Sequence, residues 1–172
     1  MSTIQTNSLQ TLAGQTMNTV LQVVHFDYGT YQSLTGADNV PLDTGLVASI
    51  APRFATSRIL VKVSANMHEV NNSTVCRARI IRTGPGTAFS TFSQTTNMTS
   101  FSTVVYSSDT TSYMRPNMDI MWFDTPNTIG TCTYRLQLAS NGGSQVVQLN
   151  GARGYTNTWG GISYITLMEI AQ

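Results

Sequence analysis

The residue types that most often carry chemistry are scarce in this chain of 172 residues, and their spacing forms no catalytic or metal-binding motif. His25 and His68 are the only histidines, and neither has a Cys, His or Asp at a metal-ligand spacing. Asp119 and Asp124 flank Ile-Met-Trp-Phe, and because paired catalytic carboxylates need a cleft, we expect them to cap turns at the two ends of a strand. No Gly-x-Ser-x-Gly elbow and no phosphate-binding loop is present. We therefore predict no enzyme, no metal site and no cofactor.

The segment from Gly151 to Gly161 has the composition of a binding loop. Its aromatic and polar side chains could form one contact surface, made of Arg153, Tyr155, Asn157 and Trp159. Tyr and Trp offer a large contact area with few rotatable bonds, which suits recognition of a protein or of a host glycan. The alternative, which we favour, is a long hairpin in which Trp159 folds back over the edge of the core.

Residues 1–19 contain no charged side chain and few apolar ones. The apolar residues that would contact a partner are Ile4, Leu9, Leu12 and Met17. Such a segment cannot bury a core of its own, but an uncharged arm can enter the groove or sheet of another protein without desolvating ions. We predict that residues 1–19 anchor the protein to a larger assembly, with a frayed terminus as the alternative. Residues 20–172 form the expected domain.

The overall charge of the chain is low. Charged residues make up 10% of it, against about 25% in average proteins, and the formal net charge is +1. Because no basic stripe is present, nucleic acid is not expected as a main partner. Residues 1–19 lack the features of a signal peptide, and no apolar run reaches the roughly 20 residues of a membrane helix. We expect a protein that is made in a host cytoplasm and has no membrane partner.

Alternating apolar residues from Val20 onward predict about nine or ten short strands and no helix. The strongest strands are expected at Val20–Phe26, Leu42–Ile50, Ile59–Met67, Val75–Arg82, Thr131–Ala139, Val146–Leu149 and Gly161–Ala171, and weaker ones near 88–92, 102–106 and 120–123. Residues 28–40 are expected to be a turn-rich connection. The spacing of strands and turns predicts an all-β fold, a jelly-roll-like antiparallel β-sandwich with an extended N-terminal arm.

The same alternation predicts which side chains form the core. The expected inward positions are Leu46, Ala48, Ile50, Ile59, Val61, Val63, Ala65, Met67, Ala78, Ile80, Cys132, Tyr134, Leu136 and Leu138. In the last strand we expect the core face to be the one that is apolar except for Thr166, namely Ile162, Tyr164, Thr166, Met168 and Ile170. Cys76 and Cys132 are predicted to be two buried free thiols, with a disulfide between them as the alternative.

Four stretches resemble a family of small phage structural proteins that occur as capsid decoration proteins and as tips of tail fibres. They are Val20–Val24, Asp43–Pro52 with Thr56–Val61, Phe123–Pro126 with Thr133–Leu136, and Ile162–Ala171. The resemblance implies a β-sandwich that forms a homotrimer, with no catalytic residue. The resemblance implies a long shaft before such a domain in a tail fibre, and because residues 1–19 do not form one, we expect a tail-fibre role less than a decoration role.

The function predicted from these features is that of a virion structural protein, most simply a decoration or cement protein bound to the major capsid protein on the capsid exterior. The alternative is a tail fibre or spike protein that uses the loop at Arg153–Trp159 to recognise host glycans. A third class, a carbohydrate-active enzyme on a jelly roll, needs two acidic residues that converge in a groove. The scarcity of Glu, present only at Glu69 and Glu169, weighs against it.

Overall fold

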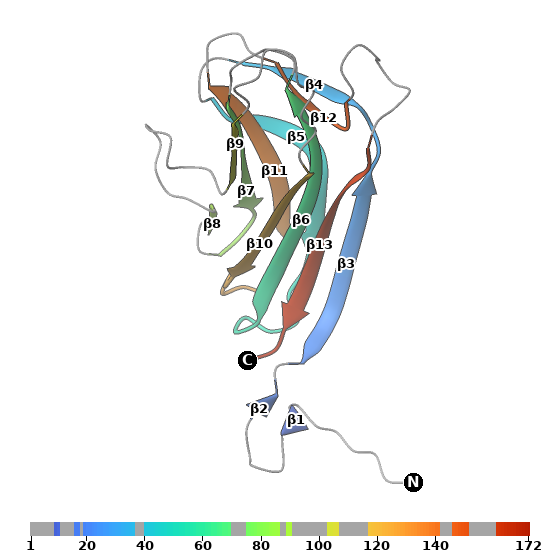
Figure 1. Cartoon of the computed structure of the whole chain (residues 1–172). Helices are drawn as coiled ribbons and strands as arrows, with labels where there is room; N and C mark the ends of the chain where they lie inside the picture. The colour runs from blue at the N-terminus through green and yellow to red at the C-terminus, as the bar shows by residue number, and fades with distance from the viewer. Residues whose placement is uncertain are drawn as a thin grey trace.

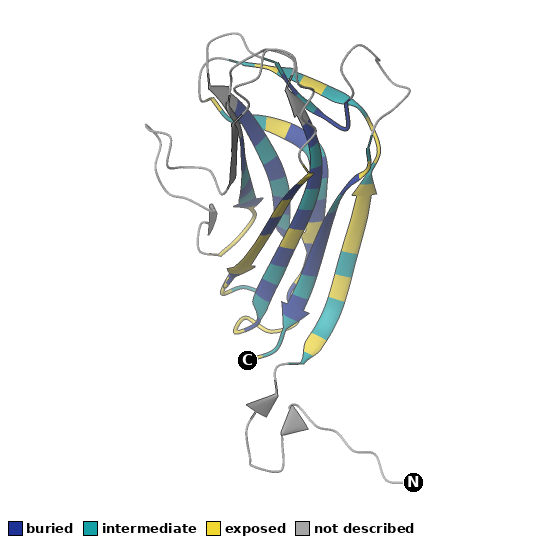
Figure 2. Cartoon of the chain, in the orientation of Figure 1, coloured by how far each residue is buried: buried dark blue, intermediate teal, exposed yellow. Residues whose placement is uncertain are grey.

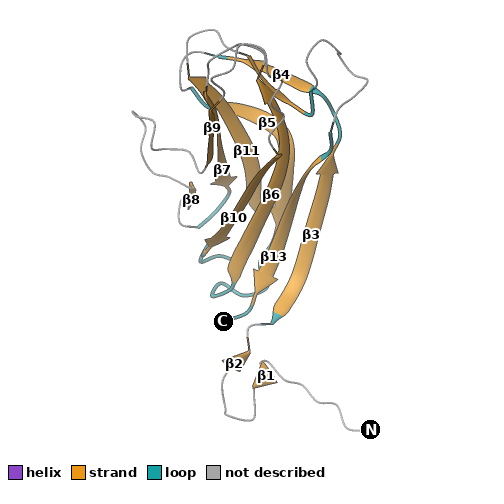
Figure 3. Cartoon of the chain, in the orientation of Figure 1, coloured by secondary structure: helices purple, strands orange, loops and turns teal. Residues whose placement is uncertain are grey.

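The computed structural model describes the backbone of residues 9–10, 16–17, 19–36, 40–69, 75–86, 89–90, 103–106, 117–141, 146–151 and 161–172. Within these residues the protein consists of strands, turns and loops, without a helix (Figures 1 and 3). The strands are β1 (Leu9–Gln10), β2 (Thr16–Met17), β3 (Val20–Tyr28), β4 (Gln32–Thr35), β5 (Leu42–Ile50), β6 (Arg58–Glu69), β7 (Val75–Thr83), β8 (Phe89–Ser90), β9 (Thr103–Tyr106), β10 (Asn117–Asp124), β11 (Cys132–Asn141), β12 (Val146–Leu149) and β13 (Ser163–Ile170).

Two antiparallel sheets form the body of the molecule (Figure 1). The β6 sheet has the strand order β3-β13-β6-β12-β4, with β10 also paired to β6. The β11 sheet has the order β5-β11-β7-β8, with β9 also paired to β7. Along the chain, the long strands β3, β5, β6, β7, β10, β11 and β13 alternate between the two sheets, which is the connectivity of a jelly roll. The predicted jelly-roll-like β-sandwich is therefore confirmed.

Side chains from both sheets meet in one hydrophobic core. All the inward positions predicted between Leu46 and Leu138 whose side chains are described are buried, so that part of the prediction is confirmed. Figure 2 shows the corresponding alternation of buried and more exposed residues along β5, β6 and β11. Met118 and Ile120 of β10 and Leu149 of β12 complete the core from the β6 sheet.

The predicted core face of β13 is wrong. Ile165 lies opposite Val63 and Leu167 lies opposite Val61 of β6, and cross-strand partners share a face of the sheet. Since Val61 and Val63 point into the core, Ile165 and Leu167 do so too, and both are fully buried. The face with Tyr164, Met168 and Ile170 is therefore the outer one. The inward face also carries Ser163 and Glu169, which are buried with hydrogen-bond partners, so the alternation of the strand favours the wrong face.

The segment 28–40 is not only a turn-rich connection, because it contains β4. This strand pairs with β12, with Leu34 opposite Val147. Leu34 packs against the core, but the other three β4 residues are polar. The pairing partner, rather than the local sequence, makes this short segment a strand.

A disulfide between Cys76 and Cys132 is excluded by the register of β7 and β11. Cys76 lies opposite Ser140, eight residues along β11 from Cys132. At about 3.3 Å per residue this places the two cysteines roughly 26 Å apart, whereas the Cα atoms of a disulfide lie within about 7 Å. Cys132 is a buried free thiol, as predicted. The side chain of Cys76 lies outside the described residues.

Candidate functional site

The two predicted contact segments lie outside the residues whose side chains are described, but the points where they join the sandwich are known. Those segments contain Ile4, Leu9, Leu12 and Met17 in the arm, and Arg153, Tyr155, Asn157 and Trp159 in the loop. The arm joins at Thr19, whose carbonyl accepts a hydrogen bond of 2.9 Å from the N–H of Ala171. The loop joins at Gly151 and Gly161. Because β3 and β13 are antiparallel and pair along their whole length, Thr19 and Gly161 lie at opposite ends of the sandwich (Figure 1).

Two further loops gather at the end of the sandwich where the arm begins. The β5–β6 loop, residues 51–57, precedes Arg58, which lies opposite Ile170 at the end of β13. The β10–β11 loop, residues 125–131, follows Asp124. On β6, Asp124 lies opposite Ile59, the residue after Arg58. We call this the Thr19 end, made of Thr19 and these two loops. Each loop exposes a large apolar side chain, with Phe54 54% exposed and Ile129 66% exposed.

A buried carboxylate holds the β5–β6 loop against the C-terminal strand. The Oε1 atom of Glu169 accepts hydrogen bonds from the backbone N–H groups of Arg53 at 2.7 Å and Phe54 at 3.3 Å. Its Oε2 atom accepts one from the side-chain amide of Gln22 at 2.7 Å, and Gln22 also donates to the carbonyl of Ala51. Glu169 thus connects β3, β13 and the loop that carries Phe54, which sets the shape of the Thr19 end.

These contacts favour the ionised form of Glu169. Burial by itself would raise the pKa of this carboxyl group. The interactions with Ser57 and Gln22 and with the two backbone N–H groups outweigh the burial and hold its pKa below the ordinary value of 4.5. Glu169 is therefore negatively charged at neutral pH when it accepts hydrogen bonds from Gln22, Arg53 and Phe54. We call this set of contacts the Glu169 clasp.

Replacing Glu169 with Gln is expected to lower the free energy of unfolding at pH 7 by about 1–3 kcal/mol, because buried N–H groups lose a charged acceptor. A carboxyl group with a lowered folded pKa stabilises the fold above its unfolded pKa, and this stabilisation is lost as the pH falls through the folded value. The difference between wild type and Glu169→Gln should therefore shrink from pH 5 to pH 2. Urea unfolding of both chains across this pH range measures the difference in the free energy of unfolding. A difference that does not change with pH contradicts the stabilising role of the Glu169 charge.

Asp119 and Asp124 do not cap turns, so that prediction is wrong. β10 is longer than expected and includes both residues, with Asp119 exposed opposite Ser64. Asp124 points inward and pairs with Arg82, with 2.8 Å between its Oδ2 atom and Nε of Arg82. The same oxygen accepts a hydrogen bond of 2.7 Å from the hydroxyl of Tyr134.

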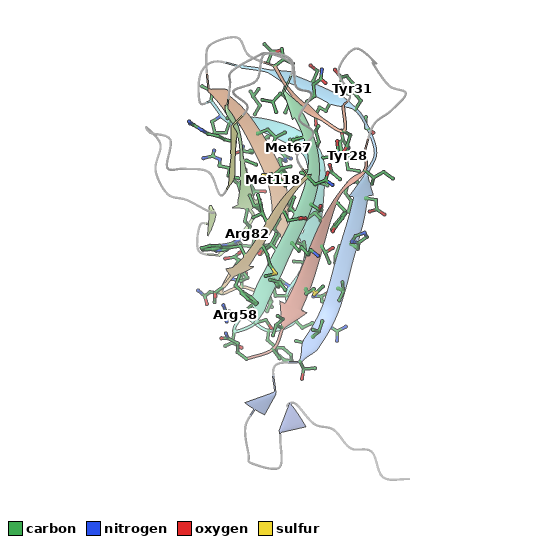
Figure 4. All side chains as sticks on the ribbon, in the orientation of Figure 1. Tyr28, Tyr31, Arg58, Met67, Arg82 and Met118 are labelled. Atoms are coloured by element: carbon green, nitrogen blue, oxygen red, sulfur yellow. The ribbon has the colours of Figure 1, made fainter. Side chains whose placement is uncertain are left out.

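The network of Arg82, Asp124 and Tyr134 joins the two sheets at the lower part of the core, where Figure 4 labels Arg82. The guanidinium group of Arg82 also donates to the carbonyl of Pro85 at 2.7 Å. Burial, followed by the hydrogen bond to Asp124, raises the pKa of Tyr134, so its hydroxyl stays protonated as a donor. All three groups are enclosed between the sheets, so the network stabilises the fold and offers no surface to a substrate.

The sequence analysis missed one arrangement on the outer face of the β6 sheet. The Nδ1 atom of His25 lies 2.8 Å from Oγ1 of Thr166, and its Nε2 atom lies 3.0 Å from Oδ1 of Asp27. The contact between His25 and Asp27 could have been predicted from the sequence, because residues i and i+2 of a strand share a face of the sheet. A hydroxyl, an imidazole and a carboxylate in this order resemble a nucleophilic triad.

This arrangement lacks the surroundings that acyl transfer requires. β13 is paired on both sides, with β3 and with β6, so the backbone N–H groups next to Thr166 are used in the sheet and cannot stabilise an oxyanion. The side chains of His25 and Asp27 are 48% and 64% exposed, on an open sheet face. We interpret these contacts as surface hydrogen bonds. In the described part of the chain no three His, Cys, Asp or Glu side chains gather to hold a metal ion, and no helix is long and apolar enough to cross a membrane.

Of the comparisons with known proteins, the one with solved structures finds similar chains. No family model matches the sequence, and no curated protein matches it. Among solved structures, the VP2 subviral particle of infectious bursal disease virus aligns with 97% of this chain at 10% identity and a TM-score of 0.46. The structure of the Gx strain of the same virus aligns over 97% at 12% identity and a TM-score of 0.39. This chain spans 44% of each of those chains. With TM-scores below 0.5, these similarities add no support for a function.

Proposed function

We propose that this chain is a non-enzymatic virion structural protein that decorates and stabilises the outer surface of a phage capsid. The observation that carries the proposal is that the two ends of the sandwich differ. The uncharged arm leaves from the Thr19 end, where Phe54 and Ile129 are exposed, and the loop 151–161 joins the opposite end. A protein with this layout can attach by one end and face the medium with the other.

The mechanism that we propose is mechanical. The arm and the Thr19 end contact neighbouring subunits on the virion surface and resist the outward pressure of packaged DNA. Homotrimers at symmetric capsid sites would make many weak contacts act together, so that the combined attachment is tighter than any single contact. The chain would be made in the host cytoplasm and would have the major capsid protein as its partner.

A chain that lacks residues 1–18 is expected to fold and to lose attachment to particles at least about a hundredfold, because the contacts of the arm no longer add to those of the Thr19 end. Thr19 is kept because its carbonyl is bonded to Ala171. Co-sedimentation of labelled protein with particles from which it has been stripped measures the binding, and circular dichroism checks the fold. Normal attachment of the shortened chain contradicts the anchoring role of the arm.

The matched control changes the opposite end. Trp159→Ala should attach to particles as wild type does, since a decoration protein does not need the loop for attachment. If this variant attaches normally but the particles no longer adsorb to host cells, the chain belongs to the second candidate class, a spike or fibre tip that recognises host glycans. The loop joins the sandwich at the end opposite Thr19, and this observation keeps the class open.

The number of copies per virion separates the two classes directly. Decoration of repeated capsid sites requires on the order of hundreds of copies, whereas trimeric fibres on a six-fold tail require about 18. Quantitative mass spectrometry of purified virions against the major capsid protein gives this number.

A further inference from the structure

The outer face of the β6 sheet carries an apolar row that crosses four strands. Phe123 of β10 lies opposite Leu60 of β6, Leu60 lies opposite Met168 of β13, and Met168 lies opposite Val23 of β3. These four residues, which we call the apolar row, all point away from the core. Phe123 is 43% exposed and Val23 is 55% exposed, and Leu60 and Met168 between them are half-buried.

The surroundings of the row extend it toward the Thr19 end. Val20, which is exposed, and Ile170, which is half-buried, lie toward that end, whereas Met121, which is also exposed, extends the row in the other direction along β10. Arg58 covers part of the row, with its guanidinium carbon 4.2 Å from the centre of the Phe123 ring. Contiguous apolar surface on one face of a protein commonly marks a binding site.

The outer face of the β11 sheet is different. Its side chains hydrogen-bond with one another across the strands: Asp43 pairs with Arg135 and accepts from Gln137, and Ser49 bonds to Thr133. Among the described residues these groups make most of that face polar, and Val47 and Ile81, which flank Arg135 on it, are half-buried. The contrast singles out the face of the β6 sheet as the one that a further chain would cover.

No described segment of the same chain covers the row, so we consider a second molecule as its partner. The arm of a neighbouring copy fits it in three respects. Residues 1–18 contain no charged side chain, so docking takes no charged side chain of the arm out of water. The arm starts at Thr19, the same end of the sheet toward which the row extends. Fully extended, 18 residues reach about 60 Å, whereas a row across three strand spacings is only about 14 Å long.

We propose that residues 1–18 of one copy dock on the apolar row of a neighbouring copy, so that the arm links copies of this chain. The inference rests on the proposed assembly role of the arm and names its partner. Copies joined in this way would attach to a particle as a unit, so removal of the arm is expected to weaken attachment even when the Thr19 end is intact.

The first test measures association in solution, without particles. Sedimentation velocity of the full chain is expected to show a reversible oligomer. The chain that lacks residues 1–18, and the double variant Leu60→Thr with Met168→Thr, should each associate at least about tenfold more weakly. Thr is chosen because it suits a strand, and Ile162→Thr, at the opposite end, is the matched control that should associate normally. A monomeric full chain, or an oligomer that survives removal of the arm, overturns the proposal.

The second test asks which chain supplies the arm, and does not depend on the stability of the double variant. One chain carries Leu9→Cys, and a second chain of different mass carries Met168→Cys. Mild oxidation should link the two, because a bond between them can only be intermolecular, and Ile162→Cys in place of Met168→Cys should link at a background level. Linkage that forms only when both cysteines are in one chain shows that the arm folds onto its own sheet, and overturns the proposal.

The two proposals can fail separately. If the purified chain links arm to row but does not bind particles, the inference stands and the decoration role is wrong. If the chain binds particles through its arm but shows no link between copies, the decoration role stands and the inference is wrong.

Discussion

Replacing Asp124 with Ala is expected to lower the free energy of unfolding by about 3–5 kcal/mol, the largest effect that we predict for a single substitution. The side chains of Asp124 and Arg82 are only 5% and 1% exposed. Removing the carboxylate leaves the guanidinium group of Arg82 buried without its counter-charge and takes the acceptor from the hydroxyl of Tyr134. Chemical denaturation followed by tryptophan fluorescence and circular dichroism measures the change.

The control for this prediction is a second carboxylate–arginine pair in the same molecule. Asp43 pairs with Arg135 on the outer face of the β11 sheet, where both side chains are more than a third exposed. Exposed pairs contribute about 0–1 kcal/mol, so Asp43→Ala should change the stability little. Equal losses for the two substitutions would show that burial does not set the strength of these pairs.

Replacing Leu136 with Ala is expected to cost about 2–5 kcal/mol, because the side chain is fully buried at the centre of β11 and its removal leaves a cavity. Leu60→Ala is the matched control, since it removes the same atoms from the half-buried outer face of β6 and should cost less than half as much. Both changes in the free energy of unfolding are measured by chemical denaturation, as for the Asp124 variant. A loss below 1 kcal/mol at Leu136 would contradict the close packing of the two sheets at this point.

Much of the fold could be predicted because the strands of this chain alternate strongly. Where one set of alternate residues is mostly polar, as in β6 with Arg58, Lys62 and Ser64 beside Leu60, the inward face follows from the hydrophobic effect alone. The alternation of β13 predicts the wrong face because two of its four inward residues, Ser163 and Glu169, are polar and buried. Its orientation depends on pairing with Val61 and Val63, residues that lie about a hundred positions earlier in the chain.

The candidate site was harder to predict. Glu169 and Asp124 read as ordinary acidic residues, and their roles depend on partners that only folding brings near, at positions 53 and 54 for one and 82 and 134 for the other. The apolar row is likewise invisible in any single strand, because each of the four strands contributes one of its residues.

The sequence alone determined the fold class, the jelly-roll-like sandwich, most of the core and the low charge, since alternation and composition are local properties that act through solvent exclusion. Only the tertiary structure decided the core face of β13, the buried pair of Arg82 and Asp124, the Glu169 clasp and the apolar row. Each of these depends on the register between strands, because a shift by one residue exchanges the two faces of a strand. The strand register, which the local pattern of an apolar strand does not specify, thus decides which surfaces this protein can offer to a partner.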